Sequence, residues 1–280
     1  MVGSIILTSN KAQIAAAGYS VESGLADNVC HFDHHGRYND YPSPCNNPAI
    51  PMAEDGAVVA ITHFDADTFV GLMRLCGCEL PAVDLSLVEM IDCSGSSIIL
   101  APREDSRELC YMQGIANAAF ERRFPRCTSE TTDVTAIVEE IMSLSTEELV
   151  SSGRVRIAAS EVGYRDCLVA EGSLLGVGKI GFWSVRRDDV LDPSRPYDDG
   201  YSLVVVYRED FKSISLYAPP HSSMTVAGKT VAGIKFEGHQ KAAGSPRGVV
   251  FRQIDAYQVF RELTDDGSDE EDYYGEEEDY

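Results

Sequence analysis

Short apolar runs that read as buried strands alternate with helical segments over the first part of the chain. The runs "SIIL" (4–7), "NVCHF" (28–32) and "AVVAIT" (57–62) have the composition of buried strands, and an Ala-rich helical segment (11–18) separates the first two. The segment 68–77 carries apolar residues at helical spacing and ends at a glycine. This alternation predicts an α/β fold, with a mostly parallel sheet covered on both faces.

The middle of the chain predicts further helices. Residues 80–92 read as a helix and 96–101 as another strand. From 105 to 175 the pattern is mainly helical, and the spacing of Ser145 and Glu148 matches a capping box ahead of one helix. We interpret this segment as a helical connector.

A second, smaller α/β unit follows the connector. A polar loop (186–200) interrupts it, two strands are expected within 201–218, and a short amphipathic helix is expected at 255–263. A chain of 280 residues is long enough for two domains that each bury a core. We predict domains at 1–175 and 176–264.

The charge of the chain limits its partners. The formal net charge is −22, and the segment 265–280 holds ten acidic residues and no basic one, which leaves −12 for the other 264 residues. Such a tail is expected to be disordered. An acidic body disfavours a long polyanion, because nonspecific nucleic-acid binding depends on Lys and Arg neutralising phosphates. A small phosphorylated molecule remains compatible.

The eight cysteines are scattered and contain no CxxC pair, so a disulfide framework is not expected. Reduced thiols, the lack of a long apolar run and the lack of a signal-like N-terminus predict a cytoplasmic protein without a membrane span. The "CGC" at 76–78 is a weak metal signal, and we interpret it as small buried residues at a helix end.

Histidines and aspartates gather where two of the predicted strands end. "HFDHHG" (31–36) and "THFDADT" (62–68) follow the second and third apolar runs. The residues concerned are Asp33, His34, His35, His63, Asp65 and Asp67. The carboxyl ends of strands in an open α/β sheet are where ligands bind, so both groups are expected to meet in one crevice.

Carboxylates mixed with imidazoles suit a hard divalent cation, and Mn²⁺ above all, whereas zinc would more often show thiolates or a three-ligand set. Two such ions about 3.5–4 Å apart activate a water and hold a phosphoryl group. The alternative is that single His and Asp residues at strand ends are caps or solvated side chains. The presence of both groups in one chain favours the metal site.

These motifs resemble those of a known family. "FDHHG" and "THFDADT" are similar to the two hallmark motifs of the DHH phosphoesterases, and "NNP" (46–48) resembles the Asn-Pro that often follows the first motif in RecJ-type exonucleases. "FEGHQKAAG" (236–244) resembles the glycine-rich signature of the associated DHHA1 domain, as in oligoribonuclease and pAp-phosphatase-like members. The resemblance implies a DHH-like first domain and a DHHA1-like second domain.

The resemblance also implies roles for single residues. His34, Asp65 and Asp67 would be metal ligands, Asp33 would orient the imidazoles, and His35 would lie beside the substrate phosphate. "LVEMIDCSGS" (87–96) resembles a later motif that supplies a ligand aspartate. Asp92 and His63 would be further metal ligands. The far end of the substrate would be held by Gly238, His239 and Gly244. A helix cap is the alternative for Asp92, and a buried structural histidine is the alternative for His239.

The sequence departs from the family pattern at several positions. The DHH motif precedes the DAD motif here, which is the reverse of the usual order. The strand 4–7 leads to Asn10 where the family has a bridging aspartate, and a neutral amide is a poorer bridge between two cations. Thr68, Glu237 and Tyr217 replace the usual glycine, glycine and arginine.

We therefore expect an Mn²⁺-dependent phosphoesterase, with Mg²⁺ as a second candidate ion, that hydrolyses a small nucleotide or a short single-stranded oligonucleotide. A homodimer is compatible with this hypothesis. The alternative is a non-catalytic module that binds a nucleotide or a protein and has lost the bridging carboxylate. The discriminating observation is whether another carboxylate, such as Asp27 or Asp40, replaces the missing aspartate.

Overall fold

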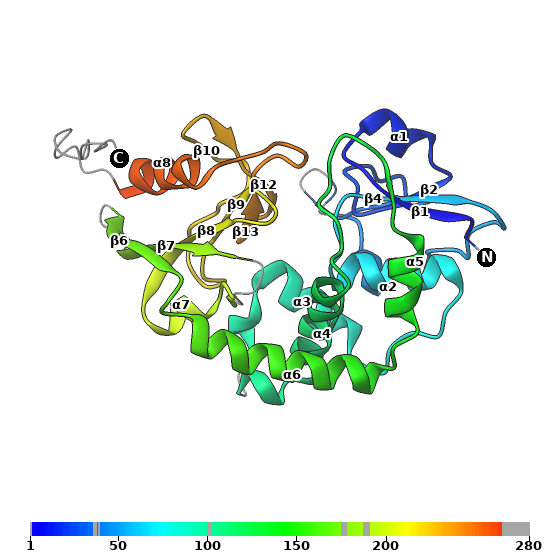
Figure 1. Ribbon diagram of the computed structural model, residues 1–280, viewed down its shortest axis with the longest axis horizontal. Helices are drawn as coiled ribbons and strands as arrows, with labels where there is room; N and C mark the ends of the chain where they lie inside the picture. Colours follow the sequence, from blue (N-terminus) through cyan, green and yellow to red (C-terminus); the bar gives the residue numbers. More distant parts are fainter. Residues whose placement is uncertain are drawn as a thin grey trace, which may run out of the picture.

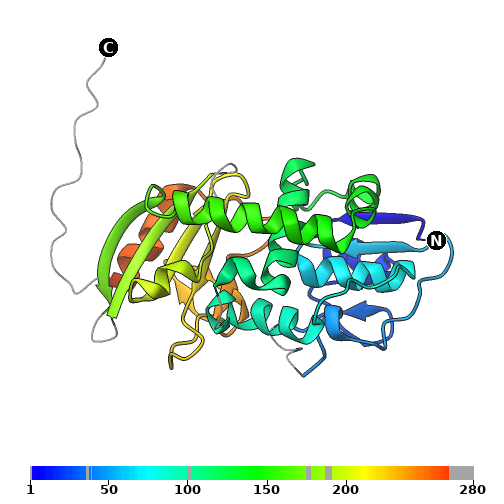
Figure 2. The same cartoon turned by 90° about the horizontal axis from the view of Figure 1, so that it is seen from below.

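The chain forms a mixed α/β fold with two main sheets. The computed structural model describes residues 2–35, 38, 40–99, 102–174, 178–186 and 191–264. Helix α6 (Thr146–Gly163) runs beneath both sheets and links them, as Figures 1 and 2 show. The α/β prediction is confirmed at this level, and the predicted disordered tail (265–280) lies outside the described residues.

The first sheet has five strands in the order β3-β2-β4-β1-β5. They are β1 (Ser4–Leu7), β2 (Tyr19–Val21), β3 (His31–Phe32), β4 (Val58–Ile61) and β5 (Thr132–Asp133). The first four are parallel, and β5 pairs antiparallel with β1. Three of the strands were predicted, although β3 is shorter than expected. The prediction missed β2 because three residues are too short to give a strand pattern.

Helices cover both faces of the first sheet. Helix α1 (Lys11–Ala16) lies on one face, where Ile14 packs near Ala60. The helices on the other face bury the main core against the strands. They are α2 (Ala66–Cys76), α3 (Leu85–Ser94), α4 (Arg107–Glu121), α5 (Thr135–Met142) and α6. The predicted capping box is confirmed, because the Ser145 hydroxyl accepts from the Glu148 N–H and the Glu148 carboxylate accepts from the Ser145 N–H.

Helices α4 and α6 pack unusually close together. A Cβ added to Gly153 would lie 1.7 Å from the Cys110 carbonyl oxygen, and one added to Gly114 would lie 1.9 Å from the Leu149 carbonyl oxygen. Only residues without a Cβ fit at these two positions, so the two glycines set the distance between the helices.

The second sheet has six strands in the order β12-β13-β9-β8-β7-β6. They are β6 (Leu168–Leu174), β7 (Gly178–Val185), β8 (Tyr201–Arg208), β9 (Ser213–Tyr217), β12 (Glu237–His239) and β13 (Ala242–Gly244). All neighbours are antiparallel except β7 and β8. A separate hairpin joins β10 (Thr230–Val231) to β11 (Ile234–Lys235).

Both faces of the second sheet are also covered. Phe182 on β7 packs against Phe260 of helix α8 (Gln253–Thr264) on one face. On the other face, the fully buried Trp183 stacks on Tyr164, the residue that ends α6, and donates from Nε1 to its carbonyl oxygen. The end of α6 is thereby fixed to the second sheet.

Two predictions along the chain are wrong. Residues 96–99 do not form the predicted strand: α3 ends at Gly95, whose φ of 83° is a left-handed value, and a short 3-10 helix, η3 (Ser96–Ile98), follows. Residues 100 and 101 lie outside the described part of the chain. The helical connector does not reach 175, because Leu168–Leu174 forms strand β6.

The helical prediction failed at β6 because this strand alternates between half-buried and exposed positions and has no apolar run. Its pairing with β7 places β6 in the second sheet, on the N-terminal side of the predicted boundary at 175. The division into domains at 1–175 and 176–264 remains a prediction. The polar segment 186–200 includes a short helix, α7 (Arg195–Asp198), and its residues 187–190 lie outside the described part.

Candidate metal centre

The polar side chains at the strand ends meet because three parallel strands end in register. Val21 pairs with Phe32 on one side and with Ile61 on the other. The next residues of these strands, Glu22 and Asp33 among them, therefore leave the sheet side by side at its carboxyl edge. The reversed motif order does not separate the two motifs, because β2 lies between β3 and β4 and aligns both.

Glu22 is the residue of the site that the sequence prediction missed. Its side chain is fully buried, and its Oε2 lies 2.6 Å from His35 Nδ1 and 3.8 Å from His63 Nε2. Burial raises the pKa of Glu22 to about 7, although His35 acts in the opposite direction. Its φ of 52° is a rare value for a residue with a side chain, and such backbone strain is concentrated at functional sites.

Asn10 and the two aspartates considered for the bridging position, Asp27 and Asp40, have other surroundings. Asn10 caps α1 by accepting from the backbone N–H groups of that helix. Asp27 accepts from three backbone N–H groups of the loop before β3, and Asp40 is exposed. Glu22, in contrast, lies beside His34 and His35.

His34 lies at the centre of the cluster. Its Nε2 is 2.9 Å from Asp67 Oδ2, 3.7 Å from Glu22 Oε1 and 4.0 Å from Asp92 Oδ2. Burial lowers the pKa of His34, but Asp67, Cys93 and Glu22 outweigh it and raise that pKa to about 12. The surrounding carboxylates therefore favour a positive charge at this position, whether a proton or a metal ion carries it.

Several atoms of the cluster are buried and have no hydrogen bond of acceptable geometry among the described residues. They are both carboxylate oxygens of Glu22, Nε2 of His34 and Oδ2 of Asp67. Glu22 Oε2 and Asp67 Oδ2 instead lie at ion-pair distance from His35 Nδ1 and His34 Nε2, so the close contacts of these atoms stay within a cluster of potential metal ligands. Ligand atoms about 2.1 Å from one octahedral cation lie about 3.0–4.2 Å apart, and the distances around His34 Nε2 are close to that range. The residues therefore fit a divalent cation.

The side chain of Asp67 is oriented by the loop that contains "NNP". Ser43 and the Cys45 N–H, at the short helix η2 (Pro44–Asn46), both donate to Asp67 Oδ1. Oδ2 is left facing His34, 2.9 Å from its Nε2. Asp67 also lies in the first turn of α2, where a carboxylate is favoured by the helix dipole.

Asp33 contacts and orients His35 within the same site. Asp33 Oδ1 accepts from the His35 N–H at 2.8 Å and lies 3.1 Å from His35 Nδ1, while Oδ2 accepts from the Gly24 N–H. Asp33 thus orients His35 and does not itself point into the cluster. Burial lowers the pKa of His35, but Glu22 and Asp33 outweigh it and raise that pKa to about 10.

His63 and Asp65 lie at the margin of the cluster. His63 Nε2 is 2.8 Å from Asp65 Oδ2, and Arg247 bonds to both Thr62 and His63. Asp65 Oδ1 caps α2 by accepting from the Thr68 N–H. Neither residue belongs to a three-ligand group among the described residues, in contrast to His34, Asp67 and Asp92.

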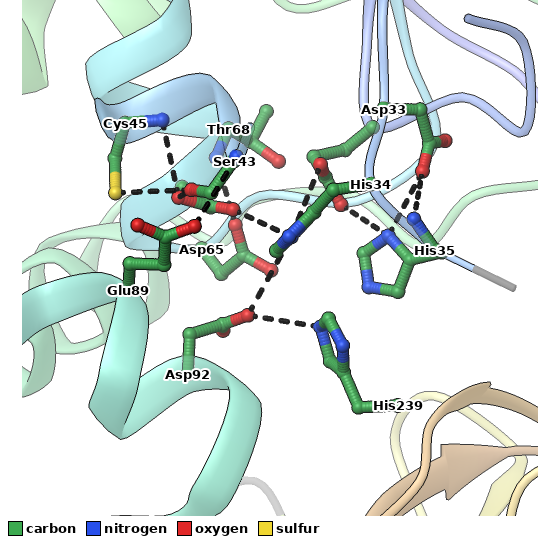
Figure 3. Close-up of polar contacts among 12 residues, drawn as sticks. Asp33, His34, His35, Ser43, Cys45, Asp65, Thr68, Glu89, Asp92 and His239 are labelled. Atoms are coloured by element: carbon green, nitrogen blue, oxygen red, sulfur yellow. Dashed lines mark hydrogen bonds and ion pairs between the residues drawn. The ribbon is translucent and has the colours of Figure 1, made fainter. Parts of the chain in front are cut away.

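The second sheet contributes His239 from across the molecule. His239 Nε2 lies 3.2 Å from Asp92 Oδ2, and its ring centroid is 4.4 Å from that of His35 (Figure 3). Gly238 has a φ of 142°, and a Cβ there would lie 2.7 Å from the Ala242 carbonyl oxygen, so the hairpin requires glycine at this position. Gly244 lies on the opposing strand β13.

A cleft of about 610 Å³ adjoins the cluster and is lined by both sheets and the connector. His35, His63, Asp65, Asp92 and His239 line one part of it, and Gly238 and Gly244 also contribute. Among the described residues the lining includes five arginines, which are Arg126, Arg156, Arg186, Arg208 and Arg247. Guanidinium groups suit phosphates, so a basic cleft exists within an acidic protein.

The described residues form three groups that could hold a metal ion, and each group includes His34. They are His34 with Asp67 and Asp92, His34 with Glu22 and His35, and His34 with Cys93 and His239. Glu22 and Cys93 were not predicted as site residues. Glu22 follows strand β2 as the other carboxylates follow their strands, but that strand is too short to give a sequence pattern. Neither Glu22 nor Cys93 therefore gave a sequence signal.

Comparisons with known proteins assign no family to the chain. No family model matches the sequence, and no curated protein matches it. Among solved structures, PggH, a pGpG-specific phosphodiesterase from Vibrio cholerae, aligns with a TM-score of 0.35 and 11% identity over 65% of this chain and 67% of that chain. At this level of similarity the alignment carries no functional argument.

A search of the described helices for one that is both long and apolar enough to cross a membrane found none.

Proposed function

We propose that the chain is a metal-dependent phosphoesterase that acts on a small nucleotide or a short single-stranded oligonucleotide. The observation that carries this proposal is the buried group of potential ligand atoms from Glu22, His34 and Asp67, whose close contacts are ion pairs within the cluster. The group lies beside a cleft rich in arginine. A site that gathers metal-ligand atoms and guanidinium groups is suited to a phosphate ester.

The proposed ligands are His34, Asp67, Asp92 and Glu22, with His63 and Asp65 as additional ligands from the margin. When bound, a divalent ion supplies Lewis acidity and lowers the pKa of a coordinated water. Mn²⁺ remains the predicted ion for the position formed by carboxylates and imidazoles, and Mg²⁺ is the second candidate.

His35 would bind the substrate phosphate. Asp33 and Glu22 both lie at its Nδ1, at 3.1 and 2.6 Å, and hold a proton there. Nε2 is left for a ligand in the cleft, which His35 lines. A protonated His35 would stabilise negative charge on a phosphoryl oxygen.

His239 and the glycines around it would hold the rest of the substrate. The hairpin β12–β13 presents Gly238 and Gly244 to the cleft, and backbone without side chains allows close approach of an anion. The arginines that line the cleft would bind further phosphates.

The alternative is a binding module without catalysis. That hypothesis depended on the loss of the bridging carboxylate at position 10. The buried Glu22, which contacts His34 and His35 through its two oxygens, supports the catalytic hypothesis over this one.

The test is release of mononucleotide from a short single-stranded oligonucleotide and from a cyclic dinucleotide, with Mn²⁺ or Mg²⁺ present. We expect turnover by the wild type, loss of turnover in Asp67→Asn, and no change in the matched variant Asp84→Asn. Asp84 caps α3 at an exposed position, and asparagine caps equally well. Binding of either nucleotide without turnover would instead support the binding module.

A further inference from the structure

Cys93 is the residue of the cluster that a site for hard cations does not explain. It follows Asp92 near the end of α3 and is half-buried. Its Sγ and one ring nitrogen each of His34 and His239 all lie within 4.8 Å of one another. Three segments that are distant in sequence, the loop after β3, helix α3 and strand β12, bring these three atoms together.

The surroundings of Cys93 differ from those of the fully buried thiols. Cys110 Sγ donates to the Glu104 carbonyl oxygen, and Cys45 Sγ bonds to the Ser43 hydroxyl and the Leu85 carbonyl oxygen. Those thiols have the hydrogen-bond partners expected of a buried structural cysteine. Cys93 instead faces two imidazoles, which are themselves metal ligands.

Asp92 lies beside this group. Asp92 Oδ2 is 3.2 Å from His239 Nε2 and 4.0 Å from His34 Nε2. Ligand atoms of a tetrahedral zinc site lie about 3.3–3.6 Å apart, given bond lengths of about 2.0–2.3 Å. The Asp92–His239 distance is close to that range and the Asp92–His34 distance is longer, so the ligand group is that of His34, Cys93 and His239, with Asp92 beside it.

A thiolate changes which ion such a site prefers. Zn²⁺ and Co²⁺ accept thiolate and imidazole ligands, whereas Mg²⁺ prefers oxygen ligands and retains its waters. The group of His34, Glu22 and His35 has no sulfur. The part of the cluster that contains Cys93 therefore suits softer cations than the part that contains Glu22 and His35.

We propose that His34, Cys93 and His239, with Asp92 beside His239, form a thiolate-containing metal position that selects a thiophilic divalent cation of the Zn²⁺ type over Mg²⁺. This inference rests on the proposed function, because it concerns the same cluster, and it assigns His239 to the metal, which leaves the glycines of the hairpin β12–β13 to hold the substrate. Cys93 binds as the thiolate, and its proton is released to solvent. An ion held there joins the hairpin β12–β13 of the second sheet to α3 beneath the first.

The experiment uses the full chain, freed of metal with a chelator and titrated with Co²⁺, Zn²⁺ and Mg²⁺. We expect Co²⁺ to produce a thiolate-to-cobalt charge-transfer absorption in the wild type and in Cys78→Ser, whose thiol is exposed and outside the cluster. Cys93→Ser should lose this absorption. Its affinity for Zn²⁺ should fall at least about tenfold, because mutating a residue that only supports a metal ligand already lowers metal affinity by that factor. Its affinity for Mg²⁺ should stay unchanged.

His239→Asn is the second variant, and circular dichroism confirms that each variant is folded. It should retain the charge-transfer absorption, because the thiol remains, and should bind Zn²⁺ more weakly. Co²⁺ binding without charge transfer in the wild type would overturn the thiolate position and leave the proposed phosphoesterase intact. The same conclusion would follow if Cys93→Ser kept the absorption. Absence of any Co²⁺, Zn²⁺ or Mg²⁺ binding would overturn both proposals.

Discussion

The close contact between α4 and α6 predicts that Gly153→Ala destabilises the protein, although alanine is the better helix former. A Cβ at this position would lie 1.7 Å from the Cys110 carbonyl oxygen and 2.7 Å from the Gly114 nitrogen. Contacts of a real Cβ are essentially never shorter than 3.0 Å, so the helices would have to separate by at least about 1.3 Å locally.

Two opposing effects set the size of the change. Replacing glycine by alanine inside a helix gains about 1 kcal/mol of helix propensity. Overpacking costs about 1–3 kcal/mol and more in severe cases, and a gap of 0.5–1 Å between packed surfaces loses about a quarter to a half of their dispersion energy. Because the clash is with backbone, which cannot rotate away, we place the cost at the upper end. The expected net loss is about 2 kcal/mol of unfolding free energy.

Thermal unfolding provides the assay. A loss of about 2 kcal/mol corresponds to a fall in Tm of about 4–8 °C for a chain of this order of size. Far-UV circular dichroism follows the helices, and fluorescence of Trp183, the single tryptophan of the chain, follows the second sheet. Both probes should detect the change, because α6 contacts Trp183 through Tyr164.

The matched control is Ser151→Ala, two residues earlier on the exposed side of the same helix. It should change the stability by less than about 0.5 kcal/mol. If Gly153→Ala raised the Tm, as helix propensity alone would predict, the proposed close packing of the two helices would be wrong.

Three further substitutions have defined expectations. Glu22→Gln removes a buried carboxylate from the cluster, so its affinity for Mn²⁺ by calorimetric titration should fall at least about tenfold; an unchanged affinity would exclude Glu22 as a ligand. Ser106→Ala removes the acceptor for the Leu109 N–H at the start of α4 and should cost about 1 kcal/mol in urea unfolding, whereas equal stability would argue against this cap. Trp183→Phe leaves the buried Tyr164 carbonyl oxygen without its donor and should cost about 1–3 kcal/mol by circular dichroism; a loss below about 0.5 kcal/mol would show that the bond contributes little.

Local patterns were enough to predict much of the first sheet. The strands at 4–7 and 57–62 are apolar runs bounded by polar residues, and the capping box at Ser145 is a four-residue signal. Placing Asp33 and His63 at one edge also needed only local information, because the carboxyl ends of parallel strands lie at the same edge of a sheet. The resemblance to the DHH phosphoesterases added the roles of these residues.

The order of the strands could not be predicted from such patterns. Strand β2 has three residues and no recognisable period, yet it lies between β3 and β4 and presents Glu22 to the histidines. Strand β6 lies within a segment that was predicted to be mainly helical. It is a strand because it pairs with β7, and its own composition does not indicate this. Strand pairing depends on neighbours that are distant in the chain, and sequence periodicity does not encode them.

The sequence by itself determined the α/β class and the two groups of His and Asp, since both follow from local periodicity and from residue chemistry. Only the tertiary structure decided that the buried Glu22 lies beside His34 and His35, that Cys93 and His239 approach His34, and that five arginines line the adjoining cleft. The physical reason is that ligand sites and clefts depend on distances between side chains separated by tens to hundreds of residues. Those distances are fixed by how strands pair and helices pack.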